Sequence, residues 1–154
     1  MYAILLPLHS LFRWLVLIIL FVAVFRAYQG RIKKYAFSSF DNTIKILTVK
    51  IVQIQFCIGI VLYILSPIVR YFLSNFSTAI HLREIRFFGM EHITMMVLAV
   101  GIITIGADKI DKAQNDYQKY RIMAMWFTIA LLMILTSIPW SFSPLTSRPN
   151  IRGF

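Results

Sequence analysis

A chain of 154 residues is long enough for one domain. Apolar residues make up 59% of it and charged residues only 14%, which excludes a soluble globular domain, since such a domain needs more polar surface. The formal net charge of +10 does not indicate nucleic-acid binding, because the basic residues sit between apolar runs and form no soluble basic face. We expect anionic lipid headgroups to be the partners of this charge.

Four apolar runs predict four membrane-spanning helices, because a helix needs about 20 residues to cross a bilayer and each run has about that length or more. The runs cover residues 5–28, 43–66, 87–106 and 122–140. The second helix is expected to begin at Ser39 or Asp41, either of which can cap a helix, and to end before Pro67. Residues 1–154 should therefore form a single all-α transmembrane domain, with the first run retained as a helix and not removed as a signal peptide.

Lysine and arginine residues predict the orientation of these helices, because they are enriched on the cytoplasmic side of membrane proteins. The connections after spans one and three, with their flanks, hold ten: Arg26, Arg31, Lys33, Lys34, Lys45, Lys50, Lys109, Lys112, Lys119 and Arg121. The opposite side holds five: Arg70, Arg83, Arg86, Arg148 and Arg152. We therefore expect an up-down four-helix bundle with both termini on the outer side.

Four ionisable residues lie inside the predicted spans, where they are costly and are therefore candidates for function. They are His9 and Arg13 in span one, and Glu91 and His92 in span three. With a helical rise of about 1.5 Å per residue, the two histidines fall at the same depth, near the outer ends of their helices. We expect Arg13 to pair with Glu91 while the two histidines approach each other, because an arginine in an apolar setting needs a partner.

Other polar residues of the spans gather at the same predicted depth. They are Tyr63, Ser66, Thr136, Ser137 and Trp140. The inner halves of the helices are expected to contain few polar residues, with Gln53 and Gln55 as the main exceptions. This one-sided polar layer predicts a site that opens toward the outer side.

Two histidines at one depth on different helices are the pattern that could ligate a single b-type haem. In that arrangement His9 and His92 are the axial ligands and Arg13 meets a haem propionate. Aromatic and thioether side chains are expected around the ring: Trp14, Met90, Met95 and Met96. Copper is an alternative, since imidazole nitrogen and thioether sulfur both bind it.

Two other interpretations stay open. A histidine near the membrane surface needs no ligand, and a Glu–His pair can simply bond a neighbouring helix, so the chain could be a non-catalytic accessory subunit packed in a larger membrane complex. Alternatively, Tyr63, Glu91 and His92 could provide hydrogen bonds or protons to a quinone or another small molecule. No hydrolytic or phosphate-binding motif is present, so a stand-alone enzyme is not expected.

Four motifs carry a resemblance that covers nearly the whole chain. They are His9-Ser10-x-x-Arg13-Trp14, Gly59-Ile60-Val61-Leu62-Tyr63-x-x-Ser66-Pro67, Glu91-His92-x-x-Met95-Met96 and Ile138-Pro139-Trp140. The chain thereby resembles short bacterial four-helix membrane proteins labelled cytochrome-b-like. The resemblance implies a protein of the bacterial cytoplasmic membrane that binds haem through His9 and His92, or an accessory subunit of a respiratory assembly. The chain departs from true cytochrome b in having too few histidines for two haems.

Overall fold

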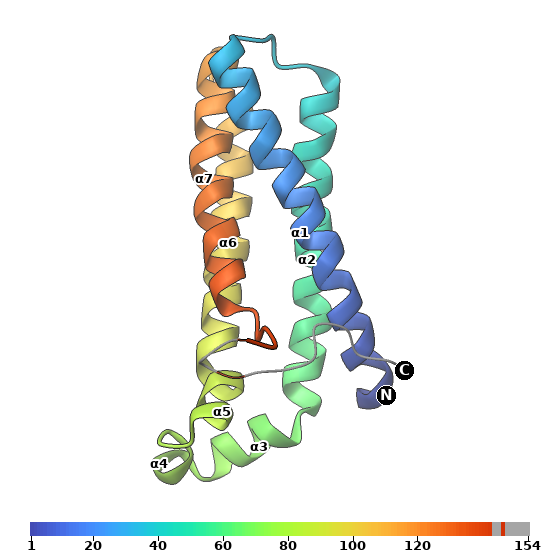
Figure 1. Cartoon of the computed structure of the whole chain (residues 1–154), viewed down its shortest axis with the longest axis vertical. Helices are drawn as coiled ribbons and strands as arrows, with labels where there is room; N and C mark the ends of the chain where they lie inside the picture. Colours follow the sequence, from blue (N-terminus) through green and yellow to red (C-terminus); the bar gives the residue numbers. More distant parts are fainter. Residues whose placement is uncertain (143–145, 147–154) are drawn as a thin grey trace.

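A computed structural model describes residues 1–142 and 146, and this part of the chain is all-helical, with no strand (Figure 1). Four helices are long and apolar enough to cross a membrane: α1 (Tyr2–Lys33), α2 (Ser39–Leu65), the segment Arg83–Asp111 and α7 (Asp116–Ser137). The third segment contains α5 (Arg83–Arg86), the π-helical turn η1 (Phe87–Glu91) and α6 (His92–Asp111). The all-α prediction is therefore confirmed.

The helices differ from the predicted spans mainly at their ends. All four extend beyond the expected runs by several residues at the end that carries the short connections. The fourth helix stops at Ser137, three residues before the predicted end. The stop is explained by Pro139, which disfavours helical backbone at the preceding residue, and Ile138 is extended in the structure.

The four long helices pack side by side, with α1 against α2 and α7, and α6 against α7 and α2 (Figure 1). The short connections after α1 and α6 lie at one end of the bundle, and α3 (Pro67–Ser74) and α4 (Phe76–Ala79) lie at the other. Small residues such as Ala23, Ala27 and Ala130 are fully buried between the helices, where they let the backbones approach closely.

Large apolar side chains also cover the outside of the bundle. Examples on three of the long helices are Phe21, Phe25, Ile64, Leu132 and Ile129. A helix of a soluble bundle carries charged and polar residues on this outer face. The exposed apolar surface is therefore what a lipid environment requires.

The entry into α2 is fixed by a reciprocal capping box. The Ser38 hydroxyl accepts a hydrogen bond from the backbone N–H of Asp41, whose carboxylate accepts one from the backbone N–H of Ser38. The predicted cap at Ser39 or Asp41 is therefore wrong: Ser38 is the N-cap and Asp41 is the third helical residue. The Ser-x-x-Asp spacing is a variant of the known capping pattern.

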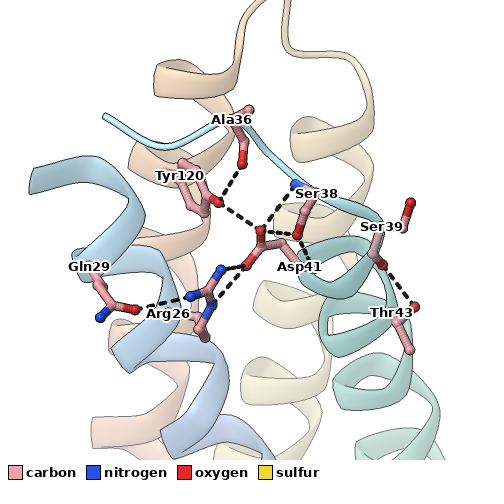
Figure 2. A network of polar contacts seen from close by, with 8 residues as sticks. All are labelled: Arg26, Gln29, Ala36, Ser38, Ser39, Asp41, Thr43 and Tyr120. Carbon is pink, nitrogen blue, oxygen red and sulfur yellow. Dashed lines mark hydrogen bonds and ion pairs between the residues drawn. The ribbon is translucent and has the colours of Figure 1, made fainter. Parts of the chain in front are cut away.

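Asp41 also joins three helices, although it is completely buried. Its Oδ1 accepts hydrogen bonds from Nε and Nη2 of Arg26 on α1, at 3.0 and 2.8 Å, and its Oδ2 accepts one from the hydroxyl of Tyr120 on α7, at 2.7 Å (Figure 2). The buried Lys45, one turn further along α2, forms an ion pair with Asp111 at the end of α6. All four long helices are thus tied together at the end with the short connections.

Gly30 allows Tyr120 to reach this cluster. A β-carbon on Gly30 would lie only 2.3–2.6 Å from three atoms of the Tyr120 ring, so the close contact of α1 with α7 requires glycine at this position. Gly101 on α6 is the opposite case, because its β-carbon would meet no atom within 4 Å.

We predict that Gly30→Ala destabilises the protein by about 1–3 kcal/mol, because the added methyl group overpacks the helix contact. Gly101→Ala is the control and should stabilise its helix, by up to about 1 kcal/mol. Thermal unfolding of the purified proteins in detergent, followed by circular dichroism, measures both. Equal melting temperatures for the two variants would contradict the packing described at Gly30.

A second prediction concerns the buried ion pair. Asp41→Asn keeps the shape of the side chain but leaves Arg26 without its counter-ion, and breaking a pair of this kind typically costs about 3–5 kcal/mol. Asp108→Asn on α6 is the matched control, because it removes an exposed ion pair with Lys112 and should leave stability nearly unchanged. The same unfolding measurement tests both, and a similar small shift for each variant would refute the proposed importance of Asp41.

Candidate functional site

A cavity of about 370 Å³ lies between α1, α2, α6 and α7, toward the end of the bundle that carries α3. Most of its lining side chains are apolar, including Leu62, Met96 and Ile134. Polar and charged side chains also line it, among them His9, Arg13, Gln55, Tyr63 and His92. The structure therefore brings together four of the six side chains that the sequence marked as cofactor-binding candidates; Trp14 and Glu91 do not line the cavity.

His92 is held in one orientation by α7. Its Nδ1 lies 2.9 Å from the backbone oxygen of Ser137, and because a carbonyl oxygen can only accept, Nδ1 must be the protonated, donating nitrogen. The ring also packs against Phe87 and Phe88, with centroid separations of 5.7 and 6.5 Å. The neutral ring therefore keeps the lone pair of Nε2 available.

The π-helical turn η1 sets the direction from which His92 enters the cavity. Gly89, in the middle of this turn, accepts a 2.7 Å hydrogen bond on its backbone oxygen from the Tyr63 hydroxyl. The Phe72 ring of α3 lies so close to Gly89 that a β-carbon there would be 2.3 Å from the ring. Tyr63 therefore positions the backbone next to His92, and wide turns of this kind are frequent at functional sites.

His9 packs against α2 at Gly59. A β-carbon on Gly59 would lie 3.2 Å from Cε1 and 3.8 Å from Nδ1 of His9, and no other atom of this ring comes within 4 Å of that point. Nδ1 is buried and has no hydrogen-bond partner among the described residues. The ring thus turns its Nδ1–Cε1 edge toward α2, and Nε2 lies further from Gly59.

Arg13, one turn from His9 on α1, is flanked by two indole rings. Its guanidinium carbon lies 5.5 Å from the centroid of Trp14 and 5.8 Å from that of Trp140. The indole N–H of Trp140 donates to the backbone oxygen of Leu135 at 2.9 Å, which fixes the ring. Trp14 therefore acts on the site by stacking beside Arg13, through the cation–π attraction of indole for a guanidinium.

The expected pairing of Arg13 with Glu91 is wrong. Glu91 instead accepts a 2.6 Å hydrogen bond from Nε of Arg86, and Arg86 also donates to the backbone oxygen of Ile80 at 3.1 Å. The π-helical register explains the change, because residues five apart, such as Arg86 and Glu91, fall on one face of such a turn. Adjacent residues diverge by about 100°, so Glu91 points away from the cavity that His92 lines.

Gln55 is the site residue that sequence reasoning missed. The sequence places it in the inner half of span two, away from the predicted polar layer. In the structure it lines the cavity, and its Nε2 donates to the backbone oxygen of His9 at 2.9 Å. A usable signal exists, because Gln55, Gly59 and Tyr63 are spaced four residues apart and share one helical face. Gln53, by contrast, is exposed and lies 3.5 Å from the hydroxyl of Thr104.

The other residues of the predicted polar layer have local roles. Ser66 caps α3 through its hydroxyl, and Ser137 contributes only its backbone oxygen to His92. The Thr136 hydroxyl bonds back to its own helix and is exposed. Of the three methionines expected around a ring, Met96 lines the cavity, whereas Met90 is exposed.

Comparisons with protein-family models, with curated proteins and with solved structures gave no match. The likeness to cytochrome-b-like membrane proteins therefore stays a prediction. The function has to be inferred from the chemistry of the cavity.

Proposed function

We propose that the chain is a multi-pass protein of the bacterial cytoplasmic membrane that binds one b-type haem between His9 and His92. The observation that carries the proposal is that these two histidines, from α1 and α6, line one largely apolar cavity. Neutral imidazole is the usual nitrogen ligand of haem iron, and the core of a helical bundle suits the macrocycle.

The surroundings of His92 support this assignment. Histidines that bind metal commonly donate their second ring N–H to a backbone carbonyl, which fixes the ring and raises its basicity. His92 makes such a bond to Ser137. A bare metal ion usually needs three or more protein ligands, and no three His, Cys, Asp or Glu side chains come together within residues 1–142 and 146. Haem iron needs only two protein ligands.

The rest of the lining fits an amphiphilic, anionic cofactor. The volume of about 370 Å³ lies toward the lower end of the range for small-molecule sites, and most of the walls are apolar. Arg13 supplies the positive charge that a propionate group needs, with its guanidinium held by Trp14 and Trp140. When bound, the haem supplies one-electron transfer; the chain orients it, balances its charge and shields it.

We propose the same orientation that the charge distribution predicts: an up-down order of the four helices, with both termini and the cavity toward the outer side. The connection at residues 34–38 and the Asp41 cluster then face the cytoplasm. The excess of lysine and arginine around that end supports this orientation.

A quinone headgroup is the second candidate ligand, because the polar groups of the same cavity could bond its oxygen atoms. Gln55 and the ring nitrogens of the two histidines provide these groups. A quinone would need hydrogen bonds alone, whereas haem would need both histidines as ligands, so an absorption spectrum separates the two. Packing within a larger respiratory complex, through the apolar outer surface, is compatible with either ligand.

We predict that the protein, produced with ample haem and purified in mild detergent, shows a Soret band and low-spin bands on reduction. His9→Ala or His92→Ala should abolish the low-spin bands, because one of the two protein ligands that would hold the iron is removed. His81→Ala is the control and should leave the spectrum unchanged, since His81 is exposed between α4 and α5. A colourless, fully helical wild-type protein would overturn the haem proposal and favour the quinone or the accessory role.

The proposed orientation predicts which positions are reachable from outside the cell. In a Cys57→Ser background, Asn75→Cys should react with a membrane-impermeant maleimide on intact spheroplasts, because Asn75 is exposed beside α3. Lys34→Cys, in the exposed connection after α1, should react only after permeabilisation. The opposite pattern would show that both termini face the cytoplasm.

A further inference from the structure

The carboxamide of Gln55 can be oriented without ambiguity. Its nitrogen lies 2.9 Å from the backbone oxygen of His9, and that oxygen can only accept a hydrogen bond. The NH₂ group must therefore face the His9 backbone, which leaves the amide oxygen Oε1 as an acceptor directed elsewhere.

Two buried polar atoms next to this contact have no partner. Oε1 of Gln55 and Nδ1 of His9 are both buried and make no hydrogen bond within the part of the chain that the structure describes. They belong to two residues that are already in contact, because the Gln55 side chain donates to the His9 backbone oxygen. Gly59, one turn beyond Gln55, has no side chain to separate the imidazole edge from α2.

The two atoms are complementary in only one tautomer of His9. With the proton on Nδ1, the ring can donate to Oε1 of Gln55, and that one bond would satisfy both atoms. With the proton on Nε2, both atoms are acceptors, so neither can satisfy the other in this buried setting, which is unfavourable.

We infer that Gln55 is a positioning residue that holds the His9 proton on Nδ1 and so presents the lone pair of Nε2 to the cavity. His92 is already in the same tautomer, because its Nδ1–H donates to Ser137. Both rings then offer Nε2 as a ligand atom before any cofactor arrives. The inference deepens the proposed haem function and rests on it for its purpose, but the tautomer is a property of the ligand-free protein.

The tautomer can be measured without haem. Protein labelled with ¹⁵N-histidine, in detergent at a pH well above the ordinary histidine pKa of about 6.5, gives separate nitrogen signals for protonated and unprotonated ring positions. His81→Ala and His92→Ala assign the three histidines. We expect His9 in the wild type to carry its proton on Nδ1.

Three substitutions test the role of the amide. Gln55→Leu removes the acceptor and should move the His9 proton mainly to Nε2, which is the preference of an imidazole that lacks a specific partner. Gln55→Glu, as the protonated carboxyl group, can donate to the His9 backbone and still offer an acceptor oxygen, so it should retain Nδ1–H. Gln53→Leu is the matched control, because Gln53 is an exposed residue of the same helix, and it should change nothing. A wild-type His9 protonated on Nε2, or an unchanged tautomer in Gln55→Leu, would overturn the inference.

A second readout separates this inference from the haem proposal. If the wild type binds haem, Gln55→Leu should weaken binding roughly tenfold, as loss of a residue that supports a ligand usually does, and Gln53→Leu should not. A wild type that binds no haem but shows the Nδ1–H signature, lost in Gln55→Leu, would refute the cofactor and leave the role of Gln55 standing. Unchanged haem binding in Gln55→Leu, together with an unchanged tautomer, would refute the role of Gln55 alone.

Discussion

The buried carboxylate of Asp41 is the constraint on which the arrangement of the helices depends. A charge without solvent is tolerated only when its oxygens are fully bonded, and here Arg26, Ser38 and Tyr120 supply those bonds from three separate parts of the chain. Satisfying one group therefore fixes the relative positions of α1, α2 and α7. The ion pair of Lys45 with Asp111 adds α6. Apolar packing alone is less directional and would leave the rotation of each helix more weakly determined.

The two ends of the bundle have different polar chemistry as a consequence. At the Asp41 end, charged groups satisfy one another and the helices are closely packed around Tyr120. At the α3 end, His9, Gln55 and His92 surround a cavity, and their polar atoms are only partly satisfied by the protein. Rigid helices held at one end can keep such groups in place at the other, which is the preorganisation that a binding site needs.

The cavity was largely predictable, because its main residues follow from helical geometry. A rise of about 1.5 Å per residue places His9 and His92 at one depth, with Tyr63 at that level and Arg13 one turn further in. The partner of Glu91 could not be predicted in the same way, and for Gln55 the sequence indicates only that it shares a helical face with Gly59 and Tyr63. The partner of Glu91 depends on the π-helical turn η1, in which residues five apart, such as Arg86 and Glu91, lie on one face. Gly89 of this turn contacts Phe72 and Tyr63, which lie far from it in the sequence. The contact of Gln55 with His9 depends on the position of α2 relative to α1 along the bundle axis.

The amino-acid sequence by itself determined the all-helical class, the four long apolar helices and the depth of the polar residues. These features depend on composition, hydrogen bonding within each helix and a fixed rise per residue, all of which are local. Only the tertiary structure decided which way each helix is rotated and which side chains meet. Those outcomes result from contacts between segments far apart in the chain, such as Tyr120 crossing Gly30, and no local periodicity encodes them.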